Sequence, residues 1–560
     1  MHYKNFTTAS YAPAMYLKDN SVSQLKDDIE KIECYLKLDK LYLETFRADI
    51  LVPREKMNEL IAMYSEKGYK LSGGITTATA GTLMGAMCYT NPETRKLLGE
   101  VAYYTAELFD EVMLDDFYFT NCRCELCIKA KGDRSWAAFR LELMNDISEN
   151  IIIKNCRAAR SDANIIIKFP NWYESFANCG YNLQDAPPMF DMLYTGTETR
   201  DPSYTQQNLA RYLSYFLPRL TENIKPGKNG GGWYDLFECN LDDYLQQAYL
   251  TLFSKCKEQM MFCIPLLSGF PVYTAAAGAA YDTLDPFVGM LGEPVGIACY
   301  EPYHCTDNIS GERHLYDFLG MLGIALEPYP TYPDKANVVF LTESSARDED
   351  IVSKMKKTLL GGGNVFITSG LYKALAGKIE DIMPLVVSDK KVTTDTFKSN
   401  GFGQNNGTYE KALSDITISH VDYNTNDVWM MSAAMTEHYS HPMLLCGTYG
   451  SGKFYVFTTP DSPDSLYKLP AGVINCLRGE LDLPVTLECG AGVGLFTYDN
   501  NTFIIQSFLT RPEKVRMRFE KTVELEMLSG TSRFNKPVKI DDNTYEVFLH
   551  PGRYAIMKYS

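Results

Sequence analysis

The first half of the chain alternates short apolar runs with segments of helical periodicity. This alternation is typical of βαβ units and predicts a parallel sheet. Eight such units fit within about 270 residues, which is the usual length of a (β/α)8 barrel. The expected strands are Thr7–Met15, Lys40–Phe46, Tyr69–Ile75, Glu111–Phe117, Ile165–Phe169, Asp191–Thr195, Tyr234–Glu238 and Phe262–Leu267. Gly230, Gly231 and Gly232 are expected to form a flexible approach to the seventh strand.

A different pattern begins after Pro333. Strand-like runs at Val338–Leu341 and Val365–Thr368 flank a helical segment at Asp348–Leu360, which predicts a second, smaller α/β domain. From about residue 480 onward, apolar and polar positions alternate between turns, which is typical of a small antiparallel β domain. We therefore expect a barrel over residues 1–335, an α/β domain over 336–480 and a β domain over 481–560.

Charge and composition narrow the classes of partner. The formal net charge of -16 disfavours nucleic acid and anionic membranes as ligands. No run approaches the roughly 18 consecutive apolar residues of a membrane helix, and the N-terminal residues lack the pattern of a secretory signal. The 15 cysteines are therefore expected to be reduced thiols or metal ligands in a cytoplasmic protein.

Polar side chains stand at the predicted strand ends, where a (β/α)8 barrel carries its reacting groups. Glycoside hydrolysis needs two carboxyl groups that flank the bond, and we expect Asp116 and Glu238, from the fourth and seventh strands, to supply them. The candidates for sugar binding are Glu44, Asp115, Lys168, Trp172, Tyr194, Glu198, Arg200 and Trp233. The alternative for each is packing or ion pairing inside the barrel. Adjacent strand residues point to opposite faces, so Asp115 and Asp116 cannot both face the mouth while the strand continues.

Four cysteines suggest a metal site. Cys122, Cys124 and Cys127 form a CxCxxC loop after the fourth strand, and Cys88 follows the third strand, its neighbour in the barrel. Four thiolates can close a tetrahedral site around structural zinc. The alternative is four reduced thiols that happen to lie close together.

The sequence DDFY at 115–118, followed by NCRCELC at 121–127, resembles family 42 glycoside hydrolases, the β-galactosidase family. The resemblance implies that Asp116 occupies the position of the acid/base, that Glu238 in DLFE at 235–238 matches the nucleophile, and that Cys88 is the fourth zinc ligand. It also implies a flavodoxin-like trimerisation domain after the barrel, a small C-terminal β domain and a homotrimer. The family has Asn-Glu where this chain has Asp115-Asp116, and its usual arginine pattern is not recognisable in the first strands.

The mechanism that the resemblance implies retains the anomeric configuration. Glu238 would attack the anomeric carbon, while Asp116 would protonate the leaving oxygen and then activate water. The shorter side chain of Asp116 could instead leave room for a water molecule between the two carboxylates, which would imply inversion. Such an acid needs a raised pKa, which apolar walls and the negative charge of Asp115 or Glu198 could supply. The expected substrate is an oligosaccharide with a β-linked bond.

Two other functions stay open at this point. The chain could be a non-catalytic carbohydrate-binding or assembly protein on a barrel scaffold, or a barrel enzyme that acts on an acidic sugar through Lys168 and Arg200.

Two further motifs are weaker indications of function. The GxxxxGK pattern at 447–453 lies between strand-like runs and continues with Phe454, which favours a hairpin turn over a phosphate loop. His304 and Cys305 are expected to have a structural or substrate-contact role.

Overall fold

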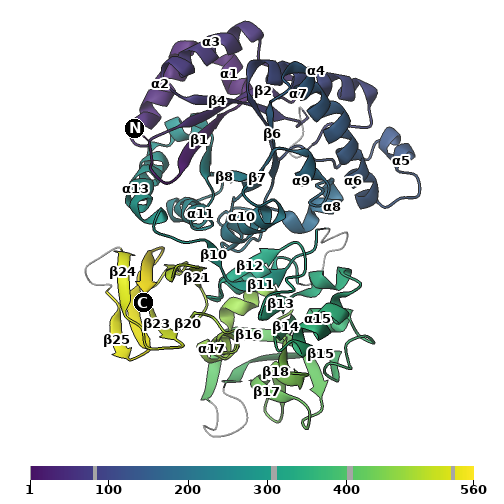
Figure 1. The fold of residues 1–560 in the computed structure, drawn as a ribbon, viewed down its shortest axis with the longest axis vertical. Coiled ribbons are helices and arrows are strands. Elements are labelled where there is room, and N and C mark those ends of the chain that lie inside the picture. Colours follow the sequence, from purple (N-terminus) through teal and green to yellow (C-terminus); the bar gives the residue numbers. More distant parts are fainter. Residues whose placement is uncertain (1, 80–84, 304–311, 400–407, 531–535) are drawn as a thin grey trace. The chain divides into compact units, whose positions relative to one another are not determined.

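The computed structural model describes residues 2–79, 85–303, 312–399, 408–530 and 536–560. The chain divides into two compact units, the first formed chiefly by residues 1–289 and the second chiefly by residues 290–560. Figure 1 shows the first unit as a ring of strands surrounded by helices.

The first unit is a closed barrel of eight parallel strands, which confirms the predicted fold. Neighbouring strands pair in parallel around the ring, and β1 closes it by pairing with both β2 and β9. The short strand β3 (Ile50–Leu51) pairs with β2 in antiparallel fashion. The barrel strands are β1 (Thr7–Ala12), β2 (Lys40–Arg47), β4 (Lys70–Thr76), β5 (Glu111–Leu114), β6 (Asn164–Phe169), β7 (Met192–Gly196), β8 (Asn229–Asp235) and β9 (Glu258–Phe262).

Helices follow the strands, as βαβ units require. Asn91 caps α4 through a hydrogen bond from the Glu93 N–H, and Pro92 occupies the first turn, where it is well tolerated. A π-helical turn, η1 (Ser148–Ile153), joins α6 to α7. The α-helices of this unit are α1 (Ala14–Asp19), α2 (Val22–Glu33), α3 (Arg54–Glu66), α4 (Pro92–Leu108), α5 (Glu125–Lys131), α6 (Trp136–Ile147), α7 (Lys154–Ala159), α8 (Phe176–Cys179), α9 (Ala186–Met189), α10 (Leu213–Ile224), α11 (Leu241–Phe253), α12 (Ile264–Gly269) and α13 (Pro271–Val288).

The glycine run lies inside strand β8 and is not the flexible approach that we expected. A Cβ atom at Gly231 would lie 2.5 Å from both the Tyr194 hydroxyl and the Glu258 carbonyl oxygen. A Cβ atom at Gly232 would lie 2.3 Å from Thr251 Cγ2. Side chains from neighbouring elements therefore fill the space beside β8, and only glycine fits there. Because the glycine run is part of the strand, β8 begins earlier than predicted, and it ends at Asp235, three residues before the predicted end.

The second unit contains a parallel sheet of five strands in the order β12-β11-β13-β14-β19, which four antiparallel strands extend beyond β19. The parallel part has the flavodoxin-like order 2-1-3-4-5. Its strands are β11 (Ile297–Tyr300), β12 (Leu326–Tyr329), β13 (Val338–Leu341), β14 (Asn364–Thr368) and β19 (Gly452–Phe457), and the extension is β15 (Leu385–Ser399), β16 (Thr408–Tyr423), β17 (Trp429–Met435) and β18 (Ser440–Tyr449). The helices beside it are α14 (Leu315–Gly320), α15 (Ile351–Leu360), α16 (Ser369–Ala374) and α17 (Ala471–Gly479).

The boundary that we expected at residue 335 lies too far along the chain. Strand β11 pairs with β12 and β13, so the α/β sheet begins before residue 300. Apolar side chains from β11, β13, β14 and α15 pack into one core, so β11 belongs to the α/β domain and not to the barrel. The GxxxxGK segment is a hairpin turn between β18 and β19, as predicted.

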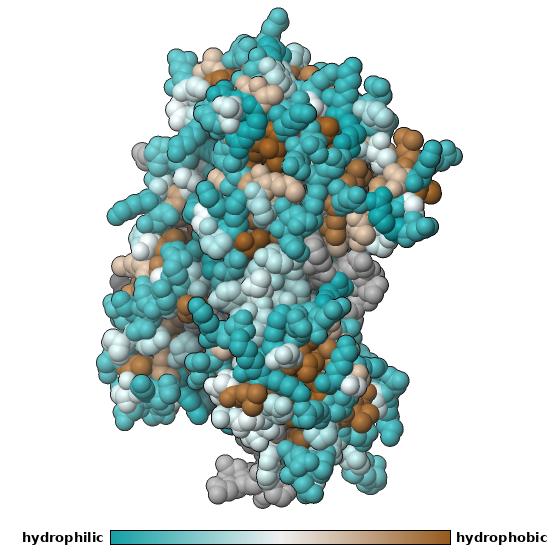
Figure 2. Space-filling model, turned by 45° about the vertical axis from the view of Figure 1, so that its right-hand side comes forward, coloured by the Kyte–Doolittle hydropathy of each residue, from teal (hydrophilic) through white to brown (hydrophobic). Residues whose placement is uncertain are grey.

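The C-terminal residues form two antiparallel sheets, as the alternating pattern predicts. The first contains β10 (Pro294–Val295), β21 (Val493–Tyr498), β22 (Thr502–Ser507), β27 (Tyr554–Tyr559) and β24 (Leu525–Gly530), and the second contains β20 (Val485–Glu488), β23 (Glu513–Phe519), β26 (Thr544–Leu549) and β25 (Val538–Asp541). Among the described residues, no helix combines the length and apolar character that a membrane crossing requires. Figure 2 shows small apolar patches within a largely hydrophilic surface.

Candidate active site

A cavity of about 730 Å³ opens at the C-terminal ends of the barrel strands, and it is the candidate active site. Most of its charged groups come from the ends of four consecutive strands, β5 to β8. These groups are Asp115, Asp116, Lys168, Glu198, Arg200 and Asp235. The opposite side is formed largely by apolar residues near the ends of β1 and β9. The cavity thus combines carboxylates with apolar walls, as the sequence predicted for this end of the barrel.

Lys168 lies at the centre of the charged side. Its ammonium group is 2.7 Å from Asp116 Oδ2, 3.2 Å from Glu198 Oε1 and 3.5 Å from Asp115 Oδ1. The same nitrogen lies 3.9 Å from the centre of the Trp233 ring, a cation–π contact. Burial alone would lower the pKa of Lys168, but the three carboxylates raise it above its ordinary value. Lys168 is therefore a fixed positive charge.

Asp115 is held in its ionised form. Burial alone would raise its pKa, but Lys168 and Arg47 outweigh this effect and hold the pKa below its ordinary value. Arg47 Nη2 lies 3.2 Å from Asp115 Oδ2, and Arg47 Nε donates to both oxygens of Glu44 at 3.0 Å. Glu44 is fully buried and accepts further hydrogen bonds from Tyr11 and Ala14. It supports Arg47 from beneath and does not line the cavity.

Asp116 has the properties of a proton donor at neutral pH. Burial raises its pKa to about 7, and the charges of Asp115 and Glu198 add to the rise, while Lys168 opposes it. Its side chain is still 16% exposed, against 3% for that of Asp115. Two adjacent carboxylates thus differ in protonation because their surroundings differ. Both line the cavity because β5 ends at Leu114 and the alternation of strand side chains stops there.

Asp235, the last residue of β8, is the cavity carboxylate from the seventh barrel strand. Its Oδ2 accepts a hydrogen bond from Arg200 Nη2 at 2.7 Å, and its Oδ1 accepts one from the Phe237 N–H at 3.0 Å. Burial raises the pKa of Asp235, although Arg200 opposes the shift. Burial likewise raises the pKa of Glu198, which stands just beyond β7.

The structure does not bring Glu238 to the cavity. Glu238 is exposed, lies in the turn after β8 with a φ of 53°, and is absent from the cavity lining. The cavity carboxylate from the seventh barrel strand is therefore Asp235 and not the expected Glu238. The reason is that the glycine run belongs to β8, so the strand ends at Asp235 and Glu238 falls in the turn that follows.

The aromatic candidates divide between wall and core. Trp172 lines the cavity and packs edge-to-face against Phe119, with ring centres 6.2 Å apart. Trp233 is almost completely buried at the cavity wall, beneath Lys168. Tyr194 is buried in the barrel core, where its hydroxyl donates to Glu258 at 3.0 Å, and it does not reach the cavity.

Sequence reasoning missed three charged residues of the cavity lining, and two of them, Arg47 and Asp235, end barrel strands. Arg47 ends β2 and lines the cavity, although we recognised no arginine pattern in the first strands. Asp235 was passed over for Glu238, three positions later. Arg47 directly follows the predicted strand Lys40–Phe46, and this position at a strand end is itself the signal that marks it as a candidate. His304 and Cys305 lie outside the described residues.

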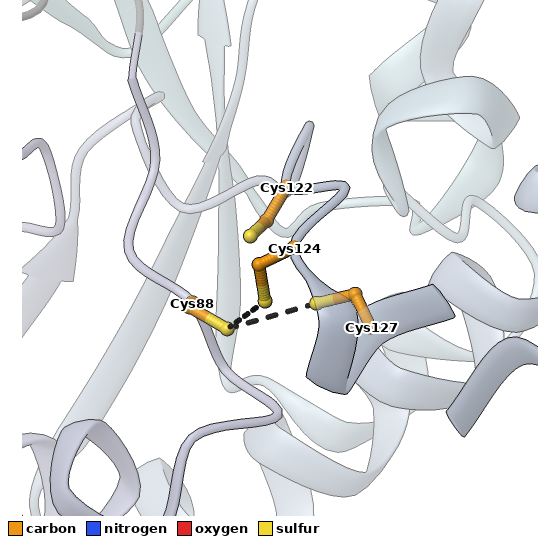
Figure 3. A group of neighbouring side chains, drawn as sticks. All are labelled: Cys88, Cys122, Cys124 and Cys127. Atoms are coloured by element: carbon orange, nitrogen blue, oxygen red, sulfur yellow. Dashed lines mark hydrogen bonds between the residues drawn. The ribbon is translucent and has the colours of Figure 1, made fainter. Parts of the chain in front are cut away.

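The four predicted cysteines meet beside the barrel (Figure 3). Cys88 comes from the segment before α4, Cys122 and Cys124 from the loop after β5, and Cys127 from α5. Their sulfur atoms all lie within 4.8 Å of one another, and Cys88 Sγ is 3.6 Å from those of Cys124 and Cys127. Tetrahedral zinc with bonds of about 2.3 Å holds its sulfurs about 3.8 Å apart. The donor set and its spacing therefore fit zinc.

A barrel with buried carboxylates at its strand ends is typical of carbohydrate-cleaving enzymes, and family comparison defines the class. Residues 1–280 match the model described as probable glycosyl hydrolase, catalytic domain. Residues 292–462 match the second domain of an uncharacterized protein, SSO3021, and residues 484–559 match the C-terminal domain of probable glycosyl hydrolases. The chain belongs to this probable glycosyl hydrolase family and is a glycoside hydrolase. The protein SSO3021 of Saccharolobus solfataricus is 23% identical over an alignment 514 residues long, which covers 81% of this chain and 82% of that protein.

Solved structures share the fold over the whole chain. The β-galactosidase of Bacillus circulans sp. alkalophilus superposes with a TM-score of 0.67 at 10% identity, covering 100% of this chain and 99% of its own. Gan42B, a family 42 β-galactosidase, gives 0.66 at 12% identity with the same coverage. The β-galactosidase of Rahnella sp. R3 gives 0.65 at 11% identity and covers 99% of this chain and 98% of its own. The expected distant relationship to family 42 is confirmed at the level of the fold.

Proposed function

We propose that this enzyme hydrolyses a β-linked glycosidic bond, with Asp116 as the acid/base and Asp235 as the second carboxylate. The observation that carries the proposal is that one cavity is lined by both side chains, which come from the ends of the fourth and seventh barrel strands. Carbohydrate hydrolysis needs such a pair on either side of the bond. The β linkage is supported by the fold shared with β-galactosidases.

Asp116 would donate its proton to the glycosidic oxygen. A pKa of about 7 leaves much of the group protonated at neutral pH and able to give the proton up. The positive charge of Lys168, 2.7 Å away, stabilises the carboxylate that forms. Burial thus favours the protonated form of Asp116 before the transfer, and Lys168 stabilises the carboxylate after it.

Asp235 would act on the opposite face of the sugar ring, as nucleophile or as the base that activates water. Its ion pair with Arg200 favours the charged form that either role requires and opposes the rise in pKa that burial causes. Lys168 and Arg200 are both paired with carboxylates of the site, and so is Arg47. These pairs disfavour an acidic sugar as substrate, because an anionic group would have to compete with carboxylates already in place.

The test compares the wild type with Asp116→Asn, Asp235→Asn and Glu238→Gln on a panel of aryl β-glycosides. We expect each Asp→Asn change to reduce kcat/KM by about 10²–10⁴-fold, the usual contribution of acid/base catalysis. The loss in Asp116→Asn should shrink when the leaving group is a nitrophenol, which needs no proton. Glu238→Gln is the matched control and should retain wild-type activity. Full activity in Asp235→Asn, or its loss in Glu238→Gln, would refute the assignment.

We also propose that Cys88, Cys122, Cys124 and Cys127 bind structural zinc. When bound, the metal would join the segment after β4 to the loop after β5, which follows Asp116 directly. Metal analysis of purified wild type should find one zinc per chain, and Cys124→Ser should lose it. Cys34→Ser, a change at another exposed cysteine, should keep it. Wild-type protein without stoichiometric metal would exclude the site.

A cytoplasmic location and a homotrimer complete the proposal. None of the fourteen cysteines of the described residues forms a disulfide, as a reducing compartment favours. The trimer rests on the resemblance to family 42, and light scattering of purified protein measures it directly.

A further inference from the structure

The two sides of the cavity differ in chemistry. The apolar side is built from Met15 on α1, Phe237 after β8, Phe262 at the end of β9, and Pro265 and Leu266 on α12. Met15 and Phe237 remain 54% and 44% exposed, although both are large apolar residues. Apolar side chains exposed inside a binding cavity are typical of a surface that an apolar group of the ligand covers.

Polar groups on this side are few, and two of them already have partners. The Tyr16 hydroxyl donates to Asp28 Oδ2 at 2.8 Å, and the Asn20 side-chain amide donates to the Tyr16 carbonyl oxygen at 2.9 Å. Asp19 is exposed at the rim. A second sugar ring placed here would bring several hydroxyl groups against apolar side chains, where the loss of their hydrogen bonds to water is unfavourable. The charged side, in contrast, offers both the catalytic groups and partners for sugar hydroxyls.

We propose that the leaving group of the substrate is apolar, so that the enzyme acts on alkyl or aryl glycosides and not on free oligosaccharides. This inference rests on the proposed function, because it places the sugar against Asp116 and Asp235 and the aglycone against Met15 and Leu266. Hydrolysis breaks the bond between the anomeric carbon and the glycosidic oxygen. Water supplies the hydroxyl group to the sugar and a proton to the oxygen of the released alcohol or phenol.

The test uses methyl, butyl and hexyl β-galactosides and β-glucosides, with lactose and cellobiose for comparison. Burial of one methylene contributes about 0.8 kcal/mol, or about fourfold in affinity, and half-burial about twofold. The value of kcat/KM should therefore rise about 30-fold or more from the methyl to the hexyl compound, and the disaccharides should be poorer than the hexyl glycosides. A flat series, or a preference for the disaccharides, would overturn the inference.

Substitutions on the apolar side of the cavity test whether this surface causes the gain with chain length. Met15→Ser and Leu266→Ser should lower the gain in kcat/KM per methylene, so their loss relative to the wild type should be larger for the hexyl than for the methyl glycosides. Phe270→Ser is the matched control, because Phe270 is 50% exposed and lies outside the cavity lining. An equal loss in all three variants would contradict the assigned surface.

Binding to Asp116→Asn, measured by calorimetry with the same alkyl series, separates the two proposals. If the wild type cleaves none of these glycosides, the proposed function fails, and the binding series still decides whether an apolar group occupies this side. If cleavage depends on Asp116 and Asp235 but binding does not increase with chain length, only the present inference fails.

Discussion

Replacement of Lys168 by methionine would remove the charge at the centre of the site while keeping most of the apolar side chain. In the wild type this ammonium group contacts Asp116, Glu198 and Asp115 at 2.7, 3.2 and 3.5 Å. Removal of one partner from a buried ion pair usually costs about 3–5 kcal/mol, because the remaining charges lose their compensation. We expect a loss of this size in the free energy of unfolding near pH 8.

The pKa of Asp116 should rise in Lys168→Met, since Lys168 is a charge that lowers it. Two unit charges about 4 Å apart attract by about 4 kcal/mol at an effective dielectric constant of 20. One pKa unit corresponds to about 1.4 kcal/mol, so an attraction of this size corresponds to about three pKa units. The alkaline limb of kcat/KM, expected near pH 7 in the wild type, should move to about pH 9 or above.

The stability of the variant follows the same reasoning. Without Lys168, the carboxylates of Asp115, Asp116 and Glu198 lose a positive partner, so their pKa values in the folded variant should lie above the values in the unfolded chain, which are about 4. They therefore bind protons more tightly in the folded state, and stability is lost as the pH rises from about 4 through the folded pKa values. The difference between wild type and variant should be smallest in acid and largest at alkaline pH.

Rate–pH profiles on an aryl glycoside and calorimetric unfolding at several pH values measure these effects. Lys40→Met is the control, because Lys40 bridges Glu111 and Glu258 at the opposite end of the barrel. It should lower stability and leave the rate–pH profile unchanged. An alkaline limb that stays near pH 7 in Lys168→Met, or moves downward, would refute the electrostatic account of Asp116.

Two further predictions concern the same unit. Asp115→Asn removes a negative charge that raises the pKa of Asp116, so the alkaline limb should move down by about one pH unit, and an upward shift in the rate–pH profile would contradict this. Gly278→Ala should destabilise the barrel by about 1–3 kcal/mol in thermal unfolding, because the new Cβ would lie 1.9 Å from a backbone carbonyl oxygen. Gly269→Ala, with no atom within 4 Å of its Cβ, should leave the stability nearly unchanged, and equal effects of the two changes would argue against this packing.

Much of the fold could be predicted because buried parallel strands form apolar runs that chain periodicity reveals. The strand at Val338–Leu341 has the predicted bounds, and the prediction for the fifth barrel strand differs from β6 by one residue. Strand β8 was misplaced because a glycine run has no apolar side chains to mark it. Its role depends on side chains such as Tyr194 and Thr251, which are distant in sequence.

The residues of the site could be predicted only where the end of the strand that carries them could be predicted. Asp116 and Lys168 follow clear apolar runs, and the structure places both in the cavity. Asp235 was missed with the end of β8. That Glu44 lies beneath Arg47 could not be foreseen, because two strand-end residues three positions apart give no sign of which one reaches the cavity.

Strand β8 carries Asp235 to the cavity, and three of the six residues that precede Asp235 in the strand are glycines. Its course depends on Tyr194 and Thr251, which occupy the space beside its glycines. A change at either residue would shift the strand, and with it the angle at which Asp235 meets the sugar, without altering any group in the cavity. Substitutions of interior residues that do not contact the substrate could therefore change which sugar this barrel accepts.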